Sequence, residues 1–248
     1  MFDFSGKFAV VTGGRQGIGE AIVRRLVSDH ASGVAILDVA SSETLARELD
    51  PSGSRVLPIV CNIADRASVA EAFKQIYDKF GRVDFLLNNA GIARDKMFHK
   101  MSDEQWDAVI GVNLQGSYNC TKQVINQMRE QGGGRIVFTS SIGIYGAVGQ
   151  SNYSASKGAL FTLTKTLARE QIGKNITVNC IIPGPIDTEL LRGAGGGGGG
   201  NSDGGGGGGG GGMRVGQPAD VASLVCYLCT DEAYYISGAR IDINGGIQ

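Results

Sequence analysis

Short runs of apolar residues alternate with longer stretches of helical periodicity along most of the chain. The apolar runs occupy residues 8–11, 34–37, 55–60, 83–87, 135–138, 176–182 and 239–243, and the helical stretches occupy residues 19–26, 68–80, 106–110, 118–128, 154–170 and 219–229. Continuously apolar runs indicate strands that are buried on both faces. Strands that alternate with helices predict a parallel sheet with right-handed crossovers. We therefore expect a doubly wound α/β fold, and the 248 residues suit a single domain spanning residues 1–248.

The first apolar run leads directly into a turn that contains Gly13, Gly17 and Gly19. Gly13 permits a tight turn, Gly17 allows the backbone to approach a pyrophosphate, and Gly19 lets the following helix pack closely on the strand. The N–H groups and the dipole of that helix attract phosphates. The turn is therefore predicted to bind a dinucleotide.

Asp38 ends the second apolar run, nineteen residues after Gly19. A carboxylate at this point accepts hydrogen bonds from the adenosine ribose and repels a 2′-phosphate. At about 4 Å and an effective dielectric constant near 20, each pair of unit charges is worth roughly 4 kcal/mol, and less where water screens it. We therefore expect NAD(H) to be preferred over NADP(H). Arg15 could swing towards a 2′-phosphate, and the alternative for Asp38 is a solvated turn residue.

Tyr153 and Lys157 are four residues apart in a helical stretch, so they share one helix face. A tyrosine with a pKa near 10 is a poor proton shuttle at neutral pH, but a neighbouring ammonium and an oxidised nicotinamide would both favour the phenolate. Ser140 follows the fifth apolar run and could polarise a carbonyl oxygen. Ligands of such folds bind beyond the carboxyl ends of the strands, where these groups are expected to converge.

Together, these motifs resemble those of the short-chain dehydrogenase/reductase family. The matching elements follow the family's order over nearly the whole chain: Thr12-Gly13 with Gly17-Ile18-Gly19, Asn88-Asn89-Ala90-Gly91, Asn113, Ser140, Tyr153 with Lys157, and Pro183-Gly184. Each element alone is a weak signal, but the set is specific. The resemblance implies a Rossmann-type fold with a seven-stranded parallel sheet, helices on both faces, and assembly as a homotetramer.

The resemblance also implies a role for each catalytic residue. Tyr153 corresponds to the catalytic acid/base, and Ser140 to the residue that stabilises the substrate oxygen. Lys157 corresponds to the residue that holds the nicotinamide ribose and lowers the pKa of the tyrosine. Asn113 corresponds to the residue that supports a water molecule in the proton relay. The alternative for Asn113 is a purely structural role in a helix kink.

The implied cofactor-binding residues come from five segments that follow apolar runs and from the helix that carries Tyr153 and Lys157. They are Gly13, Arg15, Gln16, Gly17, Ile18, Gly19, Asp38, Asn62, Ile63, Asn89, Ala90, Gly91, Tyr153, Lys157, Pro183, Gly184, Ile186 and Thr188. Asn62 stands where the family often has an aspartate beside the adenine. Asn88 and Asn89 could instead tie strands together, and Pro183-Gly184 could be a plain turn.

Three stretches are similar to the corresponding parts of 3-oxoacyl-acyl-carrier-protein reductases. They are residues 89–95, the segment up to Trp106-Asp107, and residues 149–153. This similarity implies reduction of a 3-oxoacyl thioester on acyl-carrier protein or coenzyme A. It also implies docking of an acidic carrier protein at Arg129 and Lys174, for which solvated helix-end cations are the alternative. Gln16, in place of a basic residue, and Asp38 both depart from that branch. A dehydrogenase of a free sugar, polyol, steroid-like or other secondary alcohol, or a non-catalytic NAD-binding sensor, remains open.

Composition excludes several other functions. The net charge of −1 gives no electrostatic case for binding nucleic acid or an anionic membrane. No apolar stretch approaches the ~20 residues of a membrane span, and residues 1–5 lack the features of a signal peptide. We therefore expect a cytoplasmic protein.

The five cysteines are scattered and odd in number, which favours reduced thiols over disulfides. Cys226 and Cys229 form a C-x-x-C pattern within an apolar helical stretch, so we expect them in the core rather than in a redox or metal site. His30 and His99 share no ligand spacing, and no metal site is expected.

A tract at residues 193–212 consists almost entirely of glycine. It follows residues 188–191, where the family places the mobile helices that close over substrate. Glycine costs ~1 kcal/mol per residue relative to alanine in a helix, so the tract taken literally is a flexible linker without a helical lid. Alternatively, the glycines stand in for residues whose side chains were not assigned. In either case the substrate-lid region carries no readable specificity.

Overall fold

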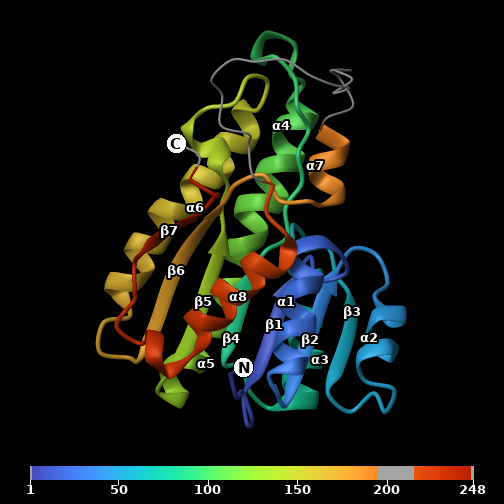
Figure 1. The fold of residues 1–248 in the computed structure, drawn as a ribbon, viewed down its shortest axis with the longest axis vertical. Coiled ribbons are helices and arrows are strands. Elements are labelled where there is room, and N and C mark those ends of the chain that lie inside the picture. The colour runs from blue at the N-terminus through green and yellow to red at the C-terminus, as the bar shows by residue number, and fades with distance from the viewer. Residues whose placement is uncertain (1, 195–214, 247–248) are drawn as a thin grey trace, which may run out of the picture.

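The computed structural model describes residues 2–194 and 215–246. Most of the predicted substrate-lid region, residues 195–212, lies outside the described residues. Seven parallel strands form one sheet in the order β3-β2-β1-β4-β5-β6-β7 (Figure 1). They are β1 (Phe8–Thr12), β2 (Gly33–Asp38), β3 (Val56–Val60), β4 (Phe85–Asn88), β5 (Gly134–Thr139), β6 (Ile176–Pro183) and β7 (Arg240–Ile243). All seven predicted strands are present, and the predicted fold class is confirmed.

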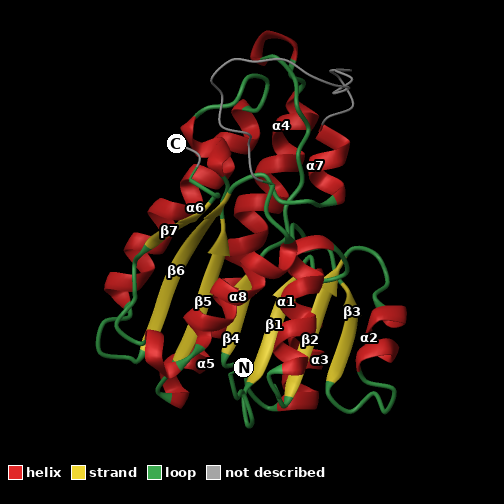
Figure 2. Ribbon diagram, viewed as in Figure 1, coloured by secondary structure: helices red, strands yellow, loops and turns green. Residues whose placement is uncertain are grey.

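Helices connect the strands and cover both faces of the sheet (Figure 2). They are α1 (Gly17–Ser28), α2 (Glu43–Leu49), α3 (Arg66–Phe80), α4 (Asp103–Ile110), α5 (Ser117–Gln131), α6 (Ser151–Glu170), α7 (Glu189–Ala194) and α8 (Pro218–Cys229). A π-helical turn, η2 (Gly111–Gly116), joins α4 to α5, and a short 3-10 helix, η3 (Ile142–Tyr145), follows β5. The sequence pattern predicted α1, α3, α4, α5, α6 and α8 but missed α2.

Successive strand residues point into two separate hydrophobic cores. In β1, Ala9 and Val11 pack with side chains of α1, α2 and α8, whereas Val10 packs on the opposite face with α3, α5 and α6. Both faces of the strand are buried, which explains why its sequence is continuously apolar.

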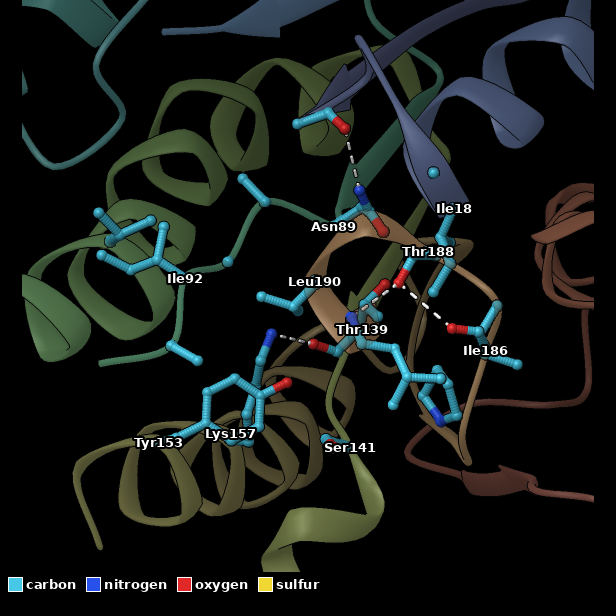
Figure 3. Close-up of a pocket in the computed structure, with 18 of the residues that line it drawn as sticks. Ile18, Asn89, Ile92, Thr139, Ser141, Tyr153, Lys157, Ile186, Thr188 and Leu190 are labelled. Carbon is cyan, nitrogen blue, oxygen red and sulfur yellow. Dashed lines mark hydrogen bonds between the residues drawn. The ribbon is translucent and has the colours of Figure 1, made fainter. Parts of the chain in front are cut away.

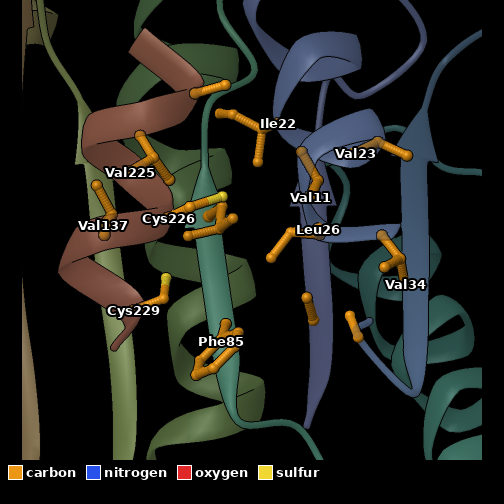
Figure 4. Packing of buried hydrophobic residues seen from close by; sticks show 14 of the residues in the cluster. Val11, Ile22, Val23, Leu26, Val34, Phe85, Val137, Val225, Cys226 and Cys229 are labelled. Atoms are coloured by element: carbon orange, nitrogen blue, oxygen red, sulfur yellow. The ribbon is translucent and has the colours of Figure 1, made fainter. Parts of the chain in front are cut away.

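Cys226 and Cys229 lie on the face of α8 that packs into the first core (Figure 4). Both are free and fully buried, and burial raises the pKa of both thiols. The prediction that these residues belong to the core is therefore confirmed. None of the helices in the described ranges is long and apolar enough to cross a membrane.

The strand order places a crevice at one edge of the sheet. From β1 the chain first builds outwards through β2 and β3, and then returns to place β4 on the other side of β1. The loops after β1 and β4 therefore separate in opposite directions at the carboxyl ends of the strands, where such folds bind ligands. A cavity of about 600 Å³ opens at this edge.

Candidate active site

The glycine turn after β1 forms one end of this cavity. Gly13 and Gly17 have φ values of +64° and +58°, a region that side chains other than glycine rarely adopt. A Cβ atom on Gly19 would lie 2.0 Å from the carbonyl oxygen of Gly13. No side chain caps the amino terminus of α1, so its first N–H groups remain available to an anion. The turn thus fits a dinucleotide pyrophosphate.

Asp38 lies at the carboxyl end of β2, beside the glycine turn. Its carboxylate accepts a hydrogen bond from the backbone N–H of Arg15 (3.3 Å) and lies 3.9 Å from the Arg15 Nε. The Arg15 guanidinium also donates to the Gln16 side chain. All three residues line the cavity. Asp38, which is predicted to bind the ribose, and Arg15, which could attract a 2′-phosphate, are therefore direct neighbours.

Asn62 and Ile63 line the same end of the cavity. The Asn62 Oδ1 accepts a hydrogen bond from the backbone N–H of Ala64 (3.1 Å), which holds the amide in a turn. Ile63 is buried and packs against Gly116, where a Cβ atom would lie 2.6 Å from the isoleucine side chain. The π-helical turn therefore approaches the predicted adenine side closely.

Asn88 and Asn89 hold the neighbouring loops together. Asn88 donates to the Thr121 hydroxyl (3.2 Å), and the Asn89 side chain donates to the carbonyl oxygens of Thr12 and Gly13 (both 3.2 Å). The Thr12 hydroxyl in turn accepts from the backbone N–H groups of Asn89 and Ala90 (both 3.0 Å). These asparagines have the strand-tying role that the sequence left open, and they fix the glycine turn.

Asn113 is fully buried in the π-helical turn. Its Oδ1 accepts from the N–H of Ile92 (2.8 Å), and its Nδ2 donates to the Ile92 carbonyl oxygen (3.1 Å) and to the Ser156 hydroxyl (3.0 Å). A Cβ atom on Gly91 would lie 3.3 Å from the Asn113 Oδ1 and 3.0 Å from the Lys157 Nζ. The Asn113 side chain thus joins the loop after β4 to α6.

Tyr153 and Lys157 project from α6 into the cavity (Figure 3). The Lys157 Nζ is buried and donates to the carbonyl oxygen of Thr139 (2.7 Å), and burial lowers its pKa to about 8. Burial also raises the pKa of Tyr153, Asp95 raises it further, and a hydrogen bond with the Ser141 side chain lowers it only in part. In the protein alone, burial therefore raises the pKa of the tyrosine, and the expected lowering by Lys157 does not contribute to the shift.

The two serines that follow β5 differ in their surroundings. The Ser140 hydroxyl is buried and donates to the backbone carbonyl oxygen of Lys157 (2.8 Å). The Ser141 hydroxyl instead accepts from the backbone N–H of Gly143 (3.2 Å), and the Ser141 side chain lies close enough to Tyr153 to lower the pKa of the phenol. Both residues line the cavity, and Ser141 rather than Ser140 is the serine that affects the pKa of the tyrosine.

The last residue of β6 and the loop that follows it close the remaining side of the cavity. Pro183, Gly184, Ile186 and Thr188 all line it. The Thr188 hydroxyl donates to the Ile186 carbonyl oxygen (3.2 Å), and its methyl group lies 3.2 Å from where a Cβ atom on Gly17 would be. This loop therefore packs directly over the glycine turn.

Arg129 and Lys174 lie at the opposite edge of the sheet from the cavity. Arg129 is in the last turn of α5, and Lys174 follows α6; each precedes the amino-terminal end of a strand. The Arg129 guanidinium donates to the Gln171 side chain (2.8 Å). The backbone N–H of Lys174 donates to the Gln171 carbonyl oxygen (3.0 Å), so Gln171 links the two segments, and neither cation lines the cavity of the same chain.

Sequence comparisons identify close relatives over the full length. Residues 7–195 match the family model described as short chain dehydrogenase. The chain is 38% identical to 3-oxoacyl-[acyl-carrier-protein] reductase FabG of Thermotoga maritima over 244 residues, covering 98% of each chain. It is 36% identical to the FabG protein of Escherichia coli, covering 99% of this chain and 98% of the relative.

The fold also matches solved structures. A 3-ketoacyl-(acyl-carrier-protein) reductase from Brucella melitensis complexed with NADH superposes with a TM-score of 0.86 at 28% identity, over 98% of this chain and 99% of the other. Levodione reductase superposes with a TM-score of 0.85 at 28% identity, over 98% of each chain. Together with the cavity and the residues that line it, these matches show that the chain belongs to the short-chain dehydrogenase family, whose members are oxidoreductases that interconvert alcohols and carbonyls.

Proposed function

We propose that the protein reduces the 3-oxo group of an acyl thioester to a secondary alcohol, with NADH as the hydride donor. The observation that carries this proposal is the convergence of the glycine turn, Asp38 and the Tyr153–Lys157 pair on one cavity. A 3-oxoacyl thioester is proposed as the substrate because of the names of the relatives. These relatives match the chain over nearly its whole length.

Asp38 supports the proposed preference for NADH. The carboxylate lies at the end of β2, where an adenosine ribose would be held, and it carries the same sign of charge as a 2′-phosphate. The adjacent Arg15 already interacts with Asp38, so its guanidinium is partly engaged. Gly13, Gly17 and the uncapped start of α1 are proposed to hold the pyrophosphate.

The proposed chemistry uses three side chains of this protein. When bound, the nicotinamide supplies a hydride to the carbonyl carbon. Tyr153 donates its phenolic proton to the carbonyl oxygen, while the buried Lys157 ammonium stabilises the phenolate that remains. We assign stabilisation of the substrate oxygen to Ser141, because its side chain contacts Tyr153 whereas the Ser140 hydroxyl is committed to a backbone carbonyl.

The lining of the substrate half of the cavity favours an acyl chain over a sugar or polyol. Apart from the catalytic side chains, this half is lined largely by apolar residues: Ile92, Ala93, Ile142, Ala147, Leu190 and Leu191. A polyol would lose its hydrogen bonds to water against such a surface, and each unpaired polar group costs free energy. A 3-oxoacyl chain would instead bury apolar surface there.

We further propose that the physiological substrate is carried by an acidic acyl-carrier protein, and that the protein is a cytoplasmic homotetramer. The reduced state of the five buried cysteines supports a reducing compartment. A groove between α5 and α6, which includes Ile125, Leu163 and Leu167, offers apolar surface for contact between subunits. Docking of the carrier at Arg129 and Lys174 remains a proposal, and it requires a carrier that also reaches the distant cavity.

The proposed function is tested by following NADH absorbance with the acetoacetyl thioester of N-acetylcysteamine as substrate. The reverse reaction is assayed with NAD and a panel of sugars, polyols and steroid alcohols. We expect thioester reduction to be the most efficient reaction. Efficient oxidation of a polyol without thioester reduction would support the free-alcohol dehydrogenase, and NADH binding without turnover of any substrate would support the sensor.

A further inference from the structure

Asp95 and Gln150 form a polar contact at the mouth of the cavity. The Gln150 Nε2 donates to the Asp95 Oδ2 at 2.7 Å. An ionised carboxylate only accepts hydrogen bonds, so the amide nitrogen of Gln150 must be the atom that faces Asp95. The orientation of the amide is therefore fixed by chemistry, and its oxygen points to a different side.

The oxygen of this amide and the ring of the catalytic tyrosine both lie near Gly143. A Cβ atom on Gly143 would be 3.5 Å from the Gln150 Oε1 and 3.4 Å from the Tyr153 ring. Gly143, Gln150 and Tyr153 all line the cavity. Within residues 2–194 and 215–246, no group donates a hydrogen bond to the Gln150 Oε1. The cavity thus presents a fixed acceptor next to the reacting group.

The backbone on both sides of this contact is held in place. The backbone N–H of Lys96 donates to the Gly149 carbonyl oxygen (2.8 Å), and the buried Asn152 side chain donates to the carbonyl oxygen of Arg94 (3.2 Å). Gln150 precedes α6 but its side chain does not cap the helix. The Gln150 amide is therefore held in position by Asp95 without being needed to start α6.

An oriented acceptor selects a hydrogen-bond donor. Glu189 of α7 also lines this cavity, and its carboxylate is likewise an acceptor only when it is ionised. Most other side chains in the substrate half are apolar, so a substrate without a donor would leave the Gln150 oxygen without a partner.

Building on the proposed thioester reduction, we propose that Gln150, oriented by Asp95, determines specificity by accepting a hydrogen bond from an amide N–H on the thiol arm of the substrate. Gln150 binds this arm in both ground state and transition state, and Asp95 acts as a positioning residue. The proposal does not depend on residues in the predicted lid region, because both side chains lie among the described residues.

The experiment compares two acetoacetyl thioesters, one of N-acetylcysteamine and one of 2-mercaptoethyl acetate, in which an ester oxygen replaces the N–H. We expect wild-type kcat/KM to be about tenfold higher for the amide, chiefly through KM, as one net hydrogen bond would give. Gln150→Leu should abolish this preference, so that the two thioesters have equal kcat/KM values. The ratio of the two kcat/KM values does not depend on the fraction of folded enzyme, so it controls for correct folding.

Variants of Asp95 test the positioning role. Asp95→Asn keeps an oxygen that accepts from the Gln150 amide and should retain most of the preference, whereas Asp95→Ala should lose it. An unchanged preference in Gln150→Leu, or equal wild-type activity on the two thioesters, would overturn this inference and leave the proposed reductase standing. Activity on neither thioester would overturn both.

Discussion

Two hydroxyl groups and one ammonium decide the chemistry at the scale of single residues. Tyr153 can donate its proton because burial raises its pKa and keeps the phenol protonated in the protein alone. Lys157 has the opposite shift, because burial disfavours its charged form. The two shifts move the pKa values of the proton donor and of the ammonium apart, because that of Tyr153 rises from its ordinary value of 10.0 while that of Lys157 falls from 10.5 to about 8.

The serine assignment can be tested with a pair of alanine substitutions. Ser141→Ala should lower kcat/KM for thioester reduction by about a hundredfold, since it removes a donor to the developing oxyanion. Ser140→Ala should have a smaller effect, because that hydroxyl donates to the Lys157 backbone. Steady-state kinetics of both variants, with NADH affinity as a control, measure this difference. The reverse order of effects would restore Ser140 to the catalytic role.

Lys157→Met should lower the activity of the protein and raise its free energy of unfolding. In the unfolded chain the lysine has its ordinary pKa of 10.5, and in the folded protein the pKa is about 8. Between these two pH values the unfolded state binds more protons than the folded state, so the free energy of unfolding rises with pH. Below about pH 8 the lysine is charged in both states, and the full cost of burying its ammonium remains. Removing the ammonium should raise the free energy of unfolding at pH 7 by on the order of 1 kcal/mol, and by less at pH 10.

The measurement is urea unfolding of Lys157→Met and wild type at the two pH values. NADH binding and turnover should both fall, because the lysine is proposed to hold the ribose. A variant that is less stable than wild type at pH 7, or one that binds NADH with unchanged affinity, would contradict this account.

The sequence alone could not distinguish the serines or reveal the Asp95–Gln150 contact. Ser140 and Ser141 are adjacent and chemically identical, and only the path of the chain after β5 decides which hydroxyl meets Tyr153. Asp95 and Gln150 are 55 residues apart, in loops without periodicity. By contrast, Tyr153 and Lys157 were predictable because helical spacing places them on one face.

At the scale of elements, close approaches between loops and helices assemble the site. The loop after β4, the π-helical turn and α6 meet at Gly91, where Asn113 and Lys157 lie within contact distance. Continuous apolar runs predicted β1, β2, β4, β5 and β6 because these strands are buried on both faces over most of their length, whereas β3 and β7 are more exposed. The short α2 was missed because seven residues carry too little periodicity.

Gly91→Ala tests this meeting point. A Cβ atom at residue 91 would lie 3.0 Å from the Lys157 Nζ and would displace the ammonium, so we expect kcat/KM to fall about tenfold to a hundredfold. Gly158→Ala is the matched control: it lies in α6, and no atom is within 4 Å of its added Cβ. The control should keep its activity and gain roughly 0.5–1 kcal/mol of stability. Equal activity in the two variants would argue against the close approach.

At the scale of the whole molecule, the cavity draws residues from the ends of six strands, β1 to β6, and joins both halves of the sheet. A ligand bound there should therefore stabilise the entire fold. The location of Arg129 and Lys174 was also decided at this scale: both residues precede strands, so a parallel sheet places them at the edge opposite the cavity. Because Arg129 and Lys174 come before predicted strands in the sequence, their position at the edge opposite the cavity could have been predicted from the sequence.

The cofactor preference can be read from global stability. NADH at about a hundred times its Kd should add about 2.7 kcal/mol to the free energy of unfolding, which raises Tm by roughly 5–10 °C in a chain of this size. NADPH at the same concentration should raise Tm less. The Asp38→Asn substitution should reduce the difference between the Tm shifts that the two cofactors produce. Thermal unfolding followed by circular dichroism measures both. A larger shift with NADPH in the wild type would rule out the proposed role of Asp38.

The most direct test of the account is Tyr153→Phe, which removes only the phenolic oxygen. Single-turnover reduction of the acetoacetyl thioester by bound NADH, measured together with the Kd for NADH, separates chemistry from binding. We predict that the rate falls by about a hundredfold or more while NADH affinity stays within about twofold of wild type. A Tyr153→Phe variant that reduces the thioester at the wild-type rate would contradict the assignment of Tyr153 as the proton donor.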